Sequence, residues 1–133
     1  MSTFLLDANV LIALTVAEHE HHDLSSDWIA EVDAFAICPI VEGALIRFLV
    51  RMGESVDTAK AVLSGIRAHS RCEFWPDSLS YINADLTTVH GHRQVTDSYL
   101  VNLARSRDGL LATLDKPLAQ DNPAHCLLLS PGD

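Results

Sequence analysis

The sequence predicts an α/β fold, a central parallel sheet with helices on both faces. Short apolar runs alternate along the chain with segments of helical spacing, and this alternation is typical of a parallel sheet with crossover helices. The runs are continuously apolar, which indicates strands that are covered on both faces. A length of 133 residues with 48% hydrophobic side chains suits one core. We therefore expect a single domain over residues 1–133 with four to five strands.

The first half of the chain is predicted to hold two strands, each followed by a helix. Leu11 and Leu14 lie on one side of the first helix, and Pro39 separates the second strand from its helix. Two further helices complete the path to the third strand, and Ser55 is placed to cap the second of these. The predicted strands are residues 3–6 and 35–38, and the predicted helices are residues 8–16, 22–32, 41–50 and 56–68.

The second half continues the alternation. A third strand ends at Pro76, and a helix is expected behind it. The clearest helix begins at Thr96-Asp97, has Leu100 and Leu103 on one face, and ends before Asp108-Gly109. The predicted strands are residues 72–75, 110–114 and 126–129, and the additional predicted helix is residues 79–89.

The charge of the chain excludes an extended surface for gripping nucleic-acid phosphates. Eighteen Asp and Glu residues against nine Lys and Arg residues give a net charge of −9, which repels polyanions at long range. Carboxylates can instead hold a hard divalent cation, which reverses the local charge where a phosphate approaches. An acidic chain of this kind can therefore act on a phosphate if its acids are in the right places.

Cysteine usage and hydropathy predict a soluble cytoplasmic protein without disulfides. Cys38, Cys72 and Cys126 are far apart, and each lies in an apolar stretch, which predicts buried thiols rather than a disulfide framework or a zinc site. Residues 8–17 form the longest nearly apolar stretch, and it is too short to span a bilayer. No basic residue precedes Arg47, whereas a secretory signal needs a positive N-terminal region.

Four acids fall where the carboxyl ends of the predicted strands share one edge of the sheet. Asp7 and Asp115 directly follow the first and fourth strands, Glu42 lies in the first turn after the second, and Asp97 opens the helix that leads into the fourth. Ligands of open parallel sheets bind at this edge. Four neighbouring carboxylates repel one another by roughly 1 to 4 kcal/mol per contacting pair. A Mg²⁺ or Mn²⁺ ion offsets this repulsion and promotes phosphodiester hydrolysis.

At these residues the chain resembles PIN-domain ribonucleases and, within that superfamily, VapC toxins of bacterial toxin–antitoxin pairs. The similarity covers almost the whole chain in order and spacing, including two intervening segments, HEHHDLSSDWI and CEFWPDSLS. The stretches that carry it most clearly are FLLDANVLIAL, CPIVEGALIRFL, GHRQVTDSYLVNLA and LATLDKPL.

The resemblance implies a Mg²⁺-dependent endoribonuclease, with Mn²⁺ as a substitute, in which a metal-activated water in an acidic pocket cuts a structured RNA, either tRNA or rRNA. It also implies a VapB-type antitoxin that places an Arg or Lys among the carboxylates, and a homodimer. In the family pattern Asn9 and Thr113 match positions that support the acids by hydrogen bonds. An outward-facing Glu42 would leave three acids to hold the metal. The catalytic and metal-binding positions carried over are Asp7, Glu42, Asp97 and Asp115.

Other interpretations of the same residues remain open at the level of sequence. Asp7 and Asp97 could simply cap helices, and Asp115 could be a turn residue. Arg93, in the loop before Asp97, is a candidate contact for substrate phosphate, although a role in holding the loop is equally compatible with its position.

An α/β chain of this kind could have one of three alternative functions. A receiver domain should carry an Asp directly after its third strand, and this chain has Trp75-Pro76 there. A haloacid-dehalogenase-like phosphatase should have a second Asp where this chain has Asn9. A PIN fold kept only as a catalytically silent binding module is the remaining alternative, and the loss of a central acid would favour it. All four acids are present.

Overall fold

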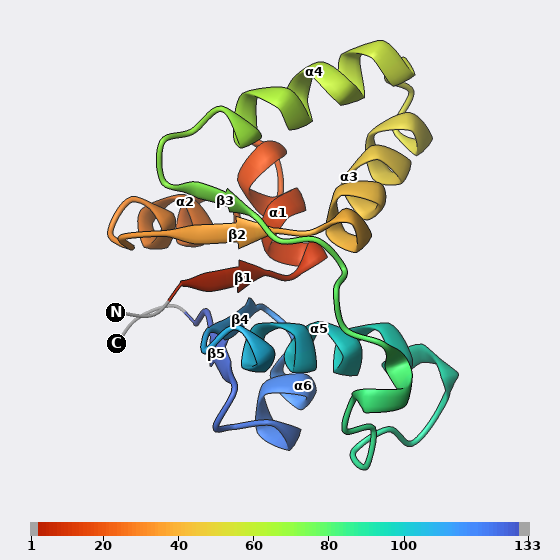
Figure 1. Ribbon diagram of the computed structural model, residues 1–133. Coiled ribbons are helices and arrows are strands. Elements are labelled where there is room, and N and C mark those ends of the chain that lie inside the picture. The colour runs from red at the N-terminus through yellow and green to blue at the C-terminus, as the bar shows by residue number, and fades with distance from the viewer. Residues whose placement is uncertain (1–2, 131–133) are drawn as a thin grey trace.

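A computed structural model describes residues 3–130 and contains one five-stranded sheet (Figure 1). The strand order is β3-β2-β1-β4-β5, and every neighbouring pair is parallel. This confirms the predicted α/β class and parallel sheet, with five strands. Each strand matches a predicted apolar run to within a residue at either end. The strands are β1 (Phe4–Leu6), β2 (Phe35–Ile37), β3 (Cys72–Phe74), β4 (Leu110–Thr113) and β5 (Cys126–Leu128).

The helices form two layers on opposite faces of the sheet. Connections that step from β1 towards β3 carry α1 to α4, and connections that step towards β5 carry α5 and α6. Because crossovers in parallel sheets are right-handed, the two groups cover opposite faces, as Figure 1 shows. The helices are α1 (Ala8–Thr15), α2 (His22–Ile29), α3 (Pro39–Arg51), α4 (Val56–Arg67), α5 (Val95–Ser106) and α6 (Lys116–Asp121).

The core lies between the central strands and these helices. Leu5, Ile37 and Leu111, on three adjacent strands, have no exposed surface, as expected for strands covered on both faces. From the other side α5 contributes Leu100 and Leu103, also buried, which confirms the predicted apolar face of that helix. Burial of such side chains stabilises the fold by about 1.5–3 kcal/mol each.

The cysteines are less uniformly buried than expected. Cys38 is fully buried, but Cys72 and Cys126 are half-buried. The prediction of three buried thiols is therefore wrong for two of them, because β3 and β5 are the edge strands of the sheet and lack a neighbour on one side. All three cysteines are free thiols.

Local capping explains where several helices begin and end. The Ser55 hydroxyl accepts a hydrogen bond from the Thr58 amide at 3.0 Å, so Ser55 caps α4 as predicted. At the other end of α5, Asp108 has a φ of 57°, and the Gly109 amide donates to the Ala104 carbonyl at 2.9 Å, which ends the helix. A side chain at Gly109 would collide with the backbone oxygen of Thr3.

Two elements differ from the sequence prediction. Residues 79–89 are not a helix; they contain only a 3₁₀ turn, Tyr81–Asn83, within a loop. Ile82 is 92% exposed, so this segment has no apolar face packed on the core, and Asn102 instead holds the loop through the backbone N–H and C=O of Asp85. Conversely, α6 (Lys116–Asp121) is not predicted by the sequence, because Pro117 and residues 120–124 resemble a turn.

None of the helices within residues 3–130 is long and apolar enough to cross a bilayer.

Candidate active site

Asp7 lies between the end of β1 and the start of α1 and is buried, with 4% of its surface exposed. Its Oδ1 accepts a hydrogen bond from the Ala8 amide at 2.8 Å, so the capping interpretation is correct as far as it goes. Its Oδ2 accepts a second bond, at 2.7 Å, from the Thr113 hydroxyl on the neighbouring strand β4. A cap alone would not need a partner on another strand.

Thr113 joins two of the predicted acids. Its side chain is fully buried, and while its hydroxyl donates to Asp7 it also accepts from the Asp115 backbone amide at 3.0 Å. The Asp115 carboxylate in turn accepts from the Leu118 amide at 3.1 Å and caps α6. One hydroxyl therefore fixes the spacing between the end of β1 and the first residues after β4.

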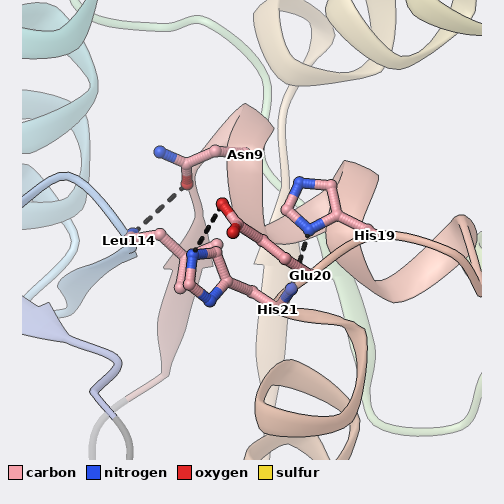
Figure 2. A network of polar contacts seen from close by, with 5 residues as sticks. All are labelled: Asn9, His19, Glu20, His21 and Leu114. Carbon is pink, nitrogen blue, oxygen red and sulfur yellow. Dashed lines mark hydrogen bonds and ion pairs between the residues drawn. The ribbon is translucent and has the colours of Figure 1, made fainter.

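Asn9 provides a second tie between the same two segments. Its Oδ1 accepts from the Leu114 amide at 3.3 Å, and Figure 2 shows the Asn9 side chain directed towards Leu114. The same view contains the loop after α1, in which His19 Nδ1 accepts from the His21 amide at 3.0 Å and the His21 ring lies 3.4 Å from Glu20. These histidines thus have local partners that order their loop.

Asp97 approaches from the opposite face of the sheet, on α5. The helix begins at Val95 with Gln94 as its N-cap, ahead of the expected cap at Thr96-Asp97, so Asp97 lies in its first turn. Asp97 and Asp115 line one pocket of about 50 Å³ between α5 and α6. Residues that sequence reasoning did not single out, Gln94 and Asp121, line the same pocket; Asp121 was missed because α6 was not predicted.

The three aspartates share one electrostatic environment. Burial, together with the charges of Asp7 and Asp115, raises the pKa of Asp97 to about 6. Burial also raises the pKa of Asp7, although hydrogen bonds from Thr113 and Ala8 oppose the rise, and the charge of Asp115 adds to it. Ionising Asp7 or Asp97 is therefore costly, and a cation beside them would offset both the cost of burial and the repulsion.

The donor set fits a hard divalent cation. Carboxylate oxygens are the ligands that Mg²⁺ and Mn²⁺ prefer. Among residues 3–130, no three Asp, Glu, His or Cys side chains stand close enough to ligate one ion together as they are arranged here. Magnesium is usually held by one or two carboxylates, with water and substrate phosphate filling the other positions, so this spacing is compatible with binding.

Glu42 stands apart from the three aspartates. It lies in the first turn of α3, and its Oε2 is 3.3 Å from Nη1 of Arg67 at the end of α4. Its charge is not among the causes of the raised pKa of Asp7 or Asp97. The structure therefore brings three of the four predicted acids together and pairs the fourth with an arginine that no sequence pattern had linked to it.

Arg93 is exposed in the 3₁₀ turn His92–Gln94, immediately before α5. In the same turn the Gln94 side chain accepts a hydrogen bond from the His90 amide. This bond holds the loop that carries Arg93 and leads to Asp97, so Gln94 supplies at least part of the loop-holding role that sequence reasoning had considered for Arg93.

Comparison with known proteins identifies the family. The PIN-domain profile matches residues 4–120. Ribonuclease VapC29 of Mycobacterium tuberculosis is 58% identical over 118 residues, which cover 88% of this chain and 89% of that protein. Ribonuclease VapC38 of the same species is 33% identical over 129 residues, 90% of this chain and 92% of its own length.

Solved structures agree on the fold. VapBC2 of Rickettsia felis, crystallised with a DNA fragment from its promoter, aligns with a TM-score of 0.67 at 15% identity and covers 96% of this chain and 99% of its own. VapC20 of M. tuberculosis, described as a toxin that cleaves the sarcin–ricin loop, aligns with a TM-score of 0.65 at 14% identity, covering 89% and 94%. From its sequence and its fold, this chain belongs to the PIN-domain family and, within it, to the VapC-type ribonucleases.

Proposed function

We propose that this VapC-type endoribonuclease uses Mg²⁺ to hydrolyse phosphodiester bonds of a structured RNA, with Asp7, Asp97 and Asp115 as its catalytic acids. The observation that carries the proposal is the electrostatic coupling of these three carboxylates, which arrive from three separate stretches of chain. Carboxylates without a counter-charge repel one another when they lie this close, and proteins concentrate such arrangements at functional sites. Cap residues on separate helices would not need to lie near one another.

Each residue of the proposed site has a separate role. Asp7 and Asp97 hold the ion, with Asp115 beside them. Thr113 fixes the orientation of the Asp7 carboxylate through Oδ2, and Asn9 keeps the segment after β4 in place. A bound ion would polarise the scissile phosphate and lower the pKa of the attacking water. Arg93, exposed next to the start of α5, offers a guanidinium to a substrate phosphate.

The substrate proposed is an exposed loop of a tRNA or rRNA. A net charge of −9 disfavours tracking along a long duplex, whereas a small acidic pocket with a local cation suits one splayed-out phosphodiester. VapC20, which has a similar fold, is described as a toxin that cleaves the sarcin–ricin loop, and this supports an RNA loop as the target of the present chain.

The partner proposed is a VapB-type antitoxin, because the R. felis relative was crystallised as a VapBC assembly. An apolar groove of about 300 Å³ lies between α1, α2 and α4, with Leu14, Ile29 and Ile66 among its walls. An antitoxin segment that orders on this groove would bury apolar surface and could place a cationic side chain among the acids. We also propose that the toxin is a homodimer, which light scattering of the purified chain would test.

The deciding experiment is incubation of the purified chain with total cellular RNA, with Mg²⁺ or with EDTA, followed by mapping of the cut ends. We expect cuts at one or a few sites that need the metal and disappear in Asp97→Asn. If the wild-type chain binds VapB but makes no metal-dependent cut, the catalytically silent binding module is the better description.

A further inference from the structure

A second cluster, of different composition from the three aspartates, is formed by Glu42, Arg67 and Phe74. The Arg67 guanidinium is 3.3 Å from the Glu42 carboxylate and stacks over the Phe74 ring with its central carbon 4.4 Å from the ring centroid. The side chain of Glu42 is 16% exposed and that of Arg67 is 45% exposed. Arg67 is thus held from two directions, by a charge and by a ring face.

This cluster is connected to the strand next to Asp7. Strand β2 pairs directly with β1, and the register that aligns Leu5 with Ala36 sets Asp7 level with Cys38. Glu42 follows Cys38 by one turn of α3. Adjacent strands are about 4.8 Å apart, so Glu42 starts from the strand next to Asp7, yet its carboxylate is turned to α4.

The charges around these groups differ in the same way. Besides burial, the charges of Asp7 and Asp115 raise the pKa of Asp97, while besides burial the pKa of the Cys72 thiol on β3 is lowered by Arg67 and raised by Glu42. Glu42 therefore belongs electrostatically with β3 and α4 in this arrangement. Glu42 is the only one of the four predicted acids with an ion-pair partner within residues 3–130.

We infer that Arg67 is a positioning residue that holds Glu42 away from the three aspartates. A divalent ion bound by those aspartates must therefore compete with Arg67 for the Glu42 carboxylate. This inference rests on the proposed function. In the absence of an ion, a fourth carboxylate would add to the repulsion among the three aspartates, and pairing with Arg67 avoids that cost. Because the pair is partly exposed it is weak, and a doubly charged ion can outcompete it.

The test measures Mn²⁺ binding to the full-length chain without RNA, by isothermal titration calorimetry. Arg67→Ala is expected to tighten Mn²⁺ binding by about two- to fivefold, the range set by a partly exposed ion pair. Arg67→Lys keeps the charge and should bind Mn²⁺ as the wild type does. Arg105→Ala, which removes an exposed arginine from the last turn of α5, is the matched control and should change nothing.

A second pair of variants shows whether Arg67 acts through Glu42. In a Glu42→Gln background, Arg67→Ala should no longer change Mn²⁺ affinity. If Arg67→Ala tightens binding equally with and without Glu42, it acts as a remote charge and the inference is overturned. It is also overturned if Arg67→Ala leaves the affinity unchanged or weakens it while thermal unfolding shows an intact fold.

Failure of the inference and failure of the proposed function give different results. Wild-type binding that is lost in Asp97→Asn but indifferent to Arg67 would refute only the role of Arg67. Absence of Mn²⁺ binding by the wild type, or unchanged binding in Asp97→Asn, would refute both.

Discussion

Two regions at the carboxyl edge of one sheet differ in whether their acids have a counter-charge. After β1 and β4, Asp7 and Asp115 lie with Asp97 in a buried or half-buried setting, where burial and neighbouring negative charge raise the pKa of Asp7 and of Asp97. After β2, Glu42 is neutralised by Arg67. Asp7, Asp115 and Glu42 all follow a strand closely in the sequence, but within residues 3–130 only Glu42 of the three has an ion-pair partner.

The difference shows which acids need a ligand. A carboxylate with an arginine partner is already satisfied and needs nothing more from solution. Carboxylates that are buried and mutually repelling retain an unfavourable free energy until a cation arrives. We therefore expect metal and substrate to bind on the β1–β4 side. On the β2–β3 side, we expect the pairing of Glu42 with Arg67 to change the affinity for the metal.

The largest expected effect is that of Asp97→Asn. It should lower RNA cleavage by at least about 100-fold, since loss of a ligand should cost no less than loss of a supporting partner. The metal-free variant should melt no lower than the wild type, because a repelling charge has been removed. Asp57→Asn, an exposed acid in the first turn of α4, is the control and should cleave normally. A clear drop in melting temperature for Asp97→Asn would instead indicate a structural role.

Thr113→Val should have the next largest effect. It removes the hydroxyl that donates to Asp7 and accepts from Asp115. We expect cleavage to fall by about 10- to 100-fold and the free energy of unfolding to fall by about 1–3 kcal/mol, since the buried Asp7 oxygen loses its donor. Thr113→Ser keeps the hydroxyl and should restore most of both. Normal cleavage by Thr113→Val would show that this bond does not orient Asp7.

The metal-free protein should lose stability as the pH rises. The pKa of Asp97 is raised from 3.8 to about 6, so between these values the folded chain holds more protons than the unfolded chain. Its contribution is fully present below pH 3.8 and lost as the pH passes 6, by at most about 3 kcal/mol; Asp7 acts in the same direction. Denaturant melts in EDTA at pH 4.5 and 7 would measure it. Asp97→Asn should show a smaller loss than the wild type, and an equal loss would assign the effect elsewhere.

Glu42→Gln should have the smallest effect if the two regions differ as described. The metal concentration for half-maximal cleavage should rise by about tenfold or less, and the free energy of unfolding should change by about 1 kcal/mol or less, as for other partly exposed ion pairs. A loss of cleavage as large as that of Asp97→Asn would remove the distinction between the two sides of the sheet.

Much of the fold was predictable because strands buried on both faces must be continuously apolar. This pattern located β1, β2, β4 and β5, and the spacing of Leu100 and Leu103 located the face of α5. Strand β3 contains Glu73 and is largely exposed, and its position was indicated by the proline that follows it, Pro76. The prediction of a helix over residues 79–89 was wrong, since a segment such as that around Ile82 can have helical spacing without a surface to pack against. The start of α6 was hidden because Asp115 and Pro117 serve equally well in a turn and at a helix N-terminus.

The sequence by itself determined the class of the fold, the five strands and the four acids near the ends of strands, because these depend on local patterns of hydrophobic and polar residues. Only the tertiary structure decided which acids meet and which is paired away. Thr113 reaches Asp7 across 106 residues of chain, and Arg67 reaches Glu42 across 25. Such contacts depend on strand order, crossover direction and side-chain rotamer, and none of these follows from the residues on either side of an acid.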